Sequence, residues 1–131
     1  MRVPAPIVLF RAATGAIVAA AFFGAGCLAP TLPLPPPESP DGMRPLGDGS
    51  WLVSGTCSPG ALVTVLVERD GVGAVVEDRD ANGRYAVAVD ATRCDTVLIW
   101  QQDGDETSAT QRVVLQEVAN GTAVDPNECV R

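Results

Sequence analysis

The sequence contains no histidine and no lysine, and these two absences argue against several kinds of catalytic site. Histidine is the side chain whose ordinary pKa lies nearest to neutrality, so the commonest general base is missing. No Gly-x-Ser-x-Gly motif, Cys-x-x-Cys motif or glycine-rich phosphate loop occurs. The carboxylates lie in turns typical of a solvated surface, which disfavours a glycosidase pair. We therefore predict that the protein is not an enzyme.

Positive charge is also scarce. Nine arginines stand against 16 acidic residues, which gives a formal net charge of −7. Without residues 1–26, which contain Arg2 and Arg11, the net charge becomes −9. A chain this acidic lacks the basic surface that attracts nucleic acid, so we expect that the protein does not bind nucleic acid. Anionic lipid headgroups would repel it, so attachment to a membrane would depend on a lipid.

The first 27 residues have the pattern of an export signal. After Arg11 comes an uncharged apolar stretch, residues 12–26, which is too short to span a bilayer comfortably. Small residues then lead into a cysteine in the order Gly24-Ala25-Gly26-Cys27. This ending resembles the lipobox of bacterial lipoproteins, although leucine is usual where Gly24 stands. A plain secretory signal and a membrane-anchoring helix are the alternatives.

The lipobox resemblance implies how the chain is processed and where it resides. Residues 1–26 would be removed, and the Cys27 thiol would carry diacylglycerol, with fatty acyl chains such as palmitate. Because Leu28 is not aspartate, the enterobacterial sorting rule implies the outer membrane. We expect no other cofactor.

Prolines dominate the segment that follows Cys27. Seven of them occur between Pro30 and Pro45. Proline fixes φ and removes a backbone donor, so this composition opposes a helix or a central strand. We expect residues 27–49 to form a disordered, extended linker at about 3 Å per residue. Such a linker would lift a domain off a membrane.

Residues 50–118 predict a single all-β domain. Turn signals recur every 8–12 residues, which is typical of a sandwich of about six to seven antiparallel strands. The run at 61–68 is apolar on both faces, so we place it in the centre of a sheet. A loose C-terminal tail is expected at 119–131. The expected strands are 51–56, 61–68, 72–77, 84–89, 96–102 and 108–118, and the expected core residues are Val63, Val65, Tyr85, Val87 and Val89.

Three motifs, in this order, resemble bacterial immunoglobulin-like domains: SGTCSPGALVTV, DRDANGRYAVAV and TVLIWQQDGDETS. Carboxypeptidase-regulatory-like domains share much of the pattern. The resemblance implies an immunoglobulin-like β-sandwich, and it implies no particular ligand. Two cysteines, Cys57 and Cys94, depart from the pattern. The matching positions are Gly55, Thr56, Pro59, Gly60, Ala61, Val63, Val65, Asp80, Gly83, Tyr85, Asp103 and Ser108.

The sequence from Asp78 to Gly83 begins like a calcium-binding loop, with Asp78, Asp80 and Asn82 at alternate positions. The twelfth position, where a glutamate should bind in a bidentate manner, is Val89. We therefore favour a β-turn and no metal, and keep these three residues as weak calcium candidates. Alternating strands would place this turn and the turn at 103–106 at the same end of the domain.

Cysteines outside the signal predict one disulfide, because export leads to an oxidising compartment. The three candidates are Cys57, Cys94 and Cys129. We favour the pair Cys57–Cys94, because Cys57 directly follows a strand and Cys129 lies in the expected tail. Alternating strand directions support Cys94–Cys129 instead, so this pair remains an alternative.

Two tryptophans are the only aromatic candidates for a binding site. Trp51 and Trp100, with Gln101 and Gln102, could form a platform for a sugar or a peptide. We favour the interpretation that both tryptophans seal the small core.

The sequence as a whole predicts an envelope-tethered lipoprotein whose domain has a non-catalytic binding or structural role. One alternative is an accessory subunit of an envelope assembly for secretion or surface display, in which a partner covers an exposed strand edge. Another is a carbohydrate-binding module that uses Trp100. The ligand is not identified by the sequence.

Overall fold

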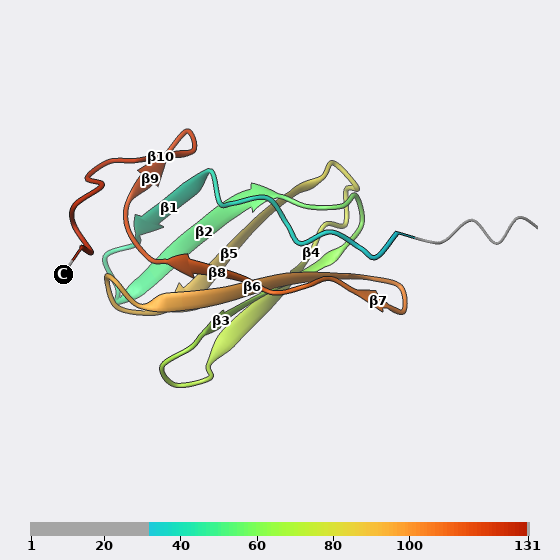
Figure 1. Cartoon of the computed structure of the whole chain (residues 1–131), viewed down its shortest axis with the longest axis horizontal. Helices are drawn as coiled ribbons and strands as arrows, with labels where there is room; N and C mark the ends of the chain where they lie inside the picture. The colour runs from blue at the N-terminus through green and yellow to red at the C-terminus, as the bar shows by residue number, and fades with distance from the viewer. Residues whose placement is uncertain (1–31, 131) are drawn as a thin grey trace, which may run out of the picture. The chain divides into compact units, whose positions relative to one another are not determined.

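A computed structural model describes residues 32–130, which form two antiparallel β-sheets packed face to face (Figure 1). The predicted all-β sandwich is confirmed. Cys27 and the expected signal peptide lie outside the described residues. Among residues 32–130, no helix is present that has the length and apolar character to cross a membrane.

Within residues 32–130, ten strands make up the two sheets, more than the six or seven expected, because several short pairings add to the main strands. Sheet A has the order β10-β9-β1-β2-β5, with β1 at Gly42–Pro45, β2 at Ser50–Thr56, β5 at Arg84–Asp90, β9 at Val118–Ala119 and β10 at Thr122–Ala123. Sheet B has the order β4-β3-β6-β7, and β8 also pairs with β6; its strands are β3 at Leu62–Val67, β4 at Gly73–Glu77, β6 at Thr96–Asp103, β7 at Glu106–Thr107 and β8 at Gln111–Val114.

The core lies between the two sheets because alternate side chains along each main strand point inward. In sheet B, inward positions on β3 and β6 are fully buried, and in sheet A the inward positions of β2 and β5 meet them. The predicted register is confirmed, since all five expected core residues are buried: Val63, Val65, Tyr85, Val87 and Val89.

Tyr85 contributes its ring to this core. It pairs across the sheet with Gly55, where a β-carbon would lie only 3.0 Å from the Tyr85 ring. Glycine at this position of the first motif therefore makes room for the tyrosine. Burial raises the pKa of the Tyr85 hydroxyl, with smaller contributions from Asp41 and Cys57.

The first strand of the sandwich lies earlier in the sequence than expected. Strand β1 pairs with β2 from Gly42 opposite Ser54 to Pro45 opposite Trp51, inside the expected linker. Residues 32–41, which we call the stem, also lie against the domain, and Pro37 and Pro40 are buried. Proline lacks an N–H but keeps its carbonyl, so an extended proline-rich segment can pack and accept hydrogen bonds. The expected disordered linker therefore differs from the structure over residues 32–49.

The C-terminal part also differs from expectation. The strand expected at 108–118 is divided into β8 in sheet B and β9 in sheet A, and the chain crosses between the sheets at the fully buried Leu115. Strand β9 pairs with β1, where Val118 lies opposite Met43, and β10 folds back onto β9. Part of the expected tail thus belongs to the sandwich.

We predict that Val65→Asp unfolds the domain. Val65 is 0% exposed, and an unpaired buried carboxylate costs several kcal/mol, which is comparable with the total stability of about 5–15 kcal/mol of a small domain. Ala86→Asp is the control, because Ala86 is exposed on β5. Thermal unfolding followed by circular dichroism should show a cooperative transition for the control only. A cooperative melt for Val65→Asp would contradict the core described here.

Candidate functional site

The outer face of sheet B is the most distinctive surface of the described chain. On β3, β4 and β6 the outward side chains are largely apolar, although this face meets solvent. Val75 is 61% exposed and Leu62 is 40% exposed. We call this surface the sheet B face; its apolar members are Leu62, Leu66, Val75, Leu98 and Trp100, with Thr64 among them.

These side chains are neighbours in the strand register. Thr64 lies opposite Val75 on one side and opposite Trp100 on the other, and Leu66 lies opposite Leu98. Residues directly opposite in antiparallel strands have adjacent side chains. The apolar members lie on three strands of about six residues, which cover roughly 14 Å by 20 Å. This corresponds to about 300 Å², a size at which the largest exposed apolar patch of a monomer is often functional.

The outer face of sheet A has a different composition. Its edge strand β5 presents Ala86 and Ala88 between Arg84 and Asp90, all exposed. A solvated sheet face of this kind, small and polar, is the usual one for an antiparallel sandwich. The apolar character of the sheet B face therefore requires an explanation other than core packing.

The two tryptophans have different positions. Trp51 is 4% exposed and belongs to the core cluster, as expected. Trp100 is half-buried and lies on the sheet B face, so the prediction that it seals the core is wrong. The reason is the alternation along β6, in which Ile99 and Gln101 take the inward positions.

Gln101 is a buried polar side chain that connects the stem to the domain. Its Nε2 donates to the carbonyl of Pro35 over 2.6 Å, and its Oε1 accepts from the amide of Ser58 over 2.8 Å. An open groove of about 390 Å³ lies beside these contacts. Because Gln101 points inward, it is not part of an aromatic platform with Trp100.

Two further contacts fix the stem. The Nε2 of Gln111 donates to Oγ of Ser39 over 2.8 Å. Nearer to β1, the guanidinium of Arg84 donates to the carboxylate of Asp41 over 2.6 Å. The proline-rich stem is therefore attached to the sandwich along its length from Pro35 onward.

The loop from Asp78 to Gly83 is an ordered turn. The Asp78 carboxylate accepts hydrogen bonds from the amides of Gly60, Asn82 and Gly83 at 2.8 to 3.3 Å. Burial raises the pKa of Asp78, and these three donors lower it by more, so that the pKa lies below its usual value. The donors occupy the oxygens that a calcium ion would need, which favours the turn interpretation.

The other two weak calcium candidates lie on the same loop. Asp80 is exposed, and Oδ1 of Asn82 accepts from the amide of Arg84 over 2.9 Å. No group of three or more His, Cys, Asp or Glu residues is placed to hold a metal ion among residues 32–130. The turn at 103–106 lies at the same end of the sandwich as this loop (Figure 1).

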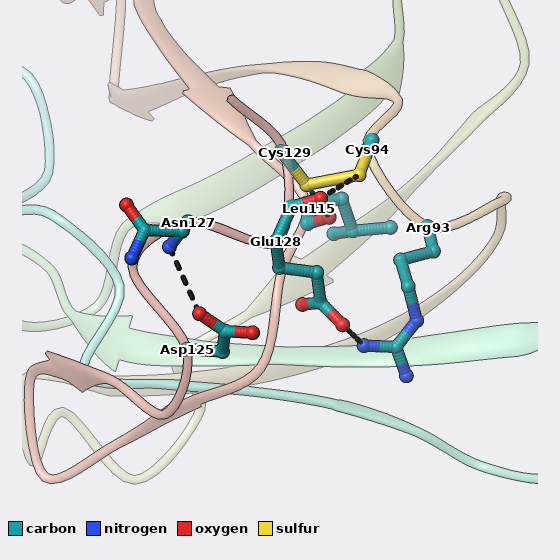
Figure 2. The surroundings of a disulfide bond; sticks show 7 residues. All are labelled: Arg93, Cys94, Leu115, Asp125, Asn127, Glu128 and Cys129. Carbon is teal, nitrogen blue, oxygen red and sulfur yellow. Dashed lines mark hydrogen bonds and ion pairs between the residues drawn. A yellow bond between two sulfur atoms is a disulfide. The ribbon is translucent and has the colours of Figure 1, made fainter. Parts of the chain in front are cut away.

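The disulfide joins Cys94 to Cys129, with 5.4 Å between their Cα atoms, so the favoured pair Cys57–Cys94 is wrong (Figure 2). The alternative pair forms because β9 and β10 return the chain to the end of the sandwich that carries Cys94. Cys94 has a φ of +69°, and its amide donates to the carbonyl of Leu115 over 2.7 Å.

Ion pairs surround the disulfide. The Arg93 guanidinium contacts Glu117 at 2.9 Å and also Glu128, as Figure 2 shows for Glu128. It also lies 5.2 Å from the centroid of the Trp51 ring. Arg93 therefore connects the C-terminal segment to a core side chain by charge and by cation–π contact.

Cys57 is the free cysteine among the described residues. Burial raises the pKa of its thiol, Asp78 raises it further, and Arg84 opposes both. A thiol with a raised pKa is a poor nucleophile at neutral pH, because the thiolate is the reactive form. Cys57 is half-buried and packs against the core, so we interpret it as a structural residue.

Comparisons with known protein families, with curated proteins and with solved structures found no match for this chain.

We predict that the Cys94–Cys129 bond stabilises the domain substantially. The bonded cysteines are 35 residues apart, for which the chain-entropy relation gives about 3–4 kcal/mol. Cys129→Ser should lower the free energy of unfolding by about that amount, and the control Cys57→Ser should change it by less than about 1 kcal/mol. Denaturant unfolding measures both. Peptide mapping without reduction that found Cys57 in a disulfide would contradict the pairing.

We also predict that Asp78 makes the domain sensitive to acid. A pKa that is lower in the folded than in the unfolded chain adds stability above the ordinary carboxyl pKa of about 4. This stability is lost as the pH falls through the folded-state pKa. Asp78→Asn should lower the melting temperature at pH 7 by several degrees and reduce its dependence on pH below 5. Asp80→Asn is the matched control, and equal effects of the two substitutions would contradict the role of Asp78.

Proposed function

We propose that this chain is a lipid-anchored protein of the cell envelope whose immunoglobulin-like sandwich is a non-catalytic binding module. The observation that carries the binding role is the exposed apolar sheet B face around Trp100. The largest exposed apolar patch of a monomer is often functional. The location rests on the sequence Gly24-Ala25-Gly26-Cys27, and the resemblance to lipoproteins favours the outer membrane.

The composition of the sheet B face favours a protein ligand over a carbohydrate. A sugar needs hydrogen-bonding side chains around the aromatic ring, whereas the neighbours of Trp100 on this face are mainly apolar. They are Leu62, Leu98, Thr64 and Gln102, and the amide of Gln102 already donates to the carbonyl of Gly104 over 3.1 Å. Gln101, which could have supplied an amide, is directed inward to Pro35. An apolar face that includes a tryptophan is instead typical of a protein interface. This supports the role of accessory subunit in an envelope assembly.

Two measurements on the native full-length protein test the proposal. Intact-mass analysis should find a mature chain that begins at Cys27 and carries lipid, and a soluble mature form without lipid mass would contradict the anchor. Light scattering after gentle detergent extraction should find additional bound protein. Trp100→Ala should release this bound protein, with Ala88→Ser on the outer face of sheet A as the control. A wild-type chain that is monomeric throughout would contradict the binding role.

A further inference from the structure

We infer that the groove beside Gln101 is a binding site for an extended proline-rich segment of another protein, and that the chain's own stem occupies it as a competing intramolecular ligand. None of the residues that line this groove belongs to the sheet B face, so the site is additional to the proposed function. Three observations carry the inference: the donors that the domain presents in the groove, the way in which the stem is held there, and the composition of the stem.

Gln101 presents a fixed donor to the groove. Its side chain is buried, with 2% of the residue exposed, so its protein partners direct its amide. Its Oε1 accepts from the amide of Ser58 over 2.8 Å, which leaves Nε2 to donate to the carbonyl of Pro35 over 2.6 Å. A buried amide donor that lacks a partner is costly. The domain is therefore built to receive a carbonyl oxygen at this point, whichever chain supplies it.

The second contact also uses a donor of the domain. Oγ1 of Thr56 donates to the carboxylate of Glu38 over 3.0 Å. An ordinary peptide would bring backbone N–H groups into the groove, where the acceptor of Gln101 is already used by Ser58. Proline has no N–H, so a run of prolines leaves no donor unpaired. The groove therefore favours a proline-rich segment over other extended peptides.

The stem is held as a ligand is held in a groove, and not as a strand of a sheet. Among the residues that the structure describes, no backbone hydrogen bond joins residues 32–40 to the sandwich, and the first one is made by the amide of Asp41. Pro37 is buried, whereas Pro35 and Pro36 stay exposed beside an open groove of about 390 Å³. A segment held in this way can leave the groove without disturbing the pairing of the strands.

The composition of the stem shows which occupant fits. Residues 32–40 have the sequence LPLPPPESP, and such a segment is extended before it binds, so it loses little entropy in a groove. A second copy of this chain offers the same sequence, but each copy has a formal net charge of −7, which opposes close approach. We therefore assign the site to a proline-rich segment of a different protein, which has to displace the stem.

Alkylation of Cys57 in the full-length chain tests whether the stem occupies the groove. Cys57 lines the groove together with the stem prolines, so its thiol reports on their presence. Pro35→Gly with Pro37→Gly loosens the stem and should raise the alkylation rate at Cys57 at least about fivefold. The matched control, Leu32→Gly with Pro33→Gly, changes two exposed stem residues outside the groove lining and should leave the rate unchanged. Peptide mapping by mass spectrometry assigns the label to Cys57.

A synthetic peptide of residues 32–40 is the probe for binding by a second molecule. Calorimetric titration of the chain with Pro35→Gly and Pro37→Gly should show saturable binding, and the bound peptide should slow the alkylation of Cys57. The wild-type chain should bind the peptide at least about fivefold more weakly, because its own stem competes. A control peptide with glycine in place of prolines 35–37 should not bind.

Variants of the groove locate the bound peptide. Thr56→Val removes the donor to Glu38 and should weaken binding about three- to tenfold. Thr64→Val on the outer face of sheet B is the matched control and should leave the affinity unchanged. Gln101→Met removes the donor to Pro35 at similar side-chain length and should also weaken binding. Thr56→Val keeps the test valid if Gln101→Met unfolds.

The inference is overturned if Cys57 reacts equally in the loosened stem variant and its control, if the peptide does not bind the loosened variant, or if the wild-type chain binds it equally well. Binding that Thr56→Val leaves unchanged would place the peptide elsewhere and would overturn it too. A wild-type dimer that Pro35→Gly with Pro37→Gly converts to a monomer would show a second copy in the groove, contrary to the inference. All of these outcomes leave the role of Trp100 untouched.

Discussion

Burial of the branched aliphatic side chains between the two sheets is the interaction on which the rest of the structure depends. Val63, Val65 and Val67 of β3 are fully buried, and each such side chain contributes roughly 1.5–3 kcal/mol. Because successive residues of a strand point to opposite faces, this burial forces Leu62 and Leu66 outward. The binding face and the core are thus set by one register, and a slip of one residue would exchange them.

The main strands could be predicted because they show clear alternation or dense β-branched residues between turn signals. Strand β5 is the clearest example: Tyr85, Val87 and Val89 alternate with Arg84, Ala86 and Ala88 and were assigned to the correct side. Strand β3 was correctly placed between two neighbours. Its apolar residues on both faces led to this central placement, and in the structure the outward residues remain partly exposed. Composition alone does not distinguish a covered face from a binding face.

The features that sequence reasoning missed depend on contacts between distant residues. Strand β1 has four residues and ends in Pro45, and β9 and β10 have two residues each, so none of them shows a period. The disulfide could not be chosen without the path of the chain after Leu115. Trp100 could have been assigned from the alternation with Val97 and Ile99, which is the one signal available in the sequence. The role of Gln101 had no such signal, because its partner Pro35 is 66 residues away.

The hydrogen bond between Gln101 and Pro35 also bears on how far the domain could lie from an anchor at Cys27. Pro35 lies eight positions after Cys27 in the sequence, which corresponds to a reach of at most about 28 Å. Without this hydrogen bond the other contacts of the stem, which begin with Glu38 and Thr56, would still limit the reach to about 39 Å. In a chain anchored at Cys27, the contacts of the stem together would confine the sandwich to a thin layer beside the bilayer. The domain would then encounter other proteins of the same membrane at high effective concentration, and it would not reach more distant structures of the envelope.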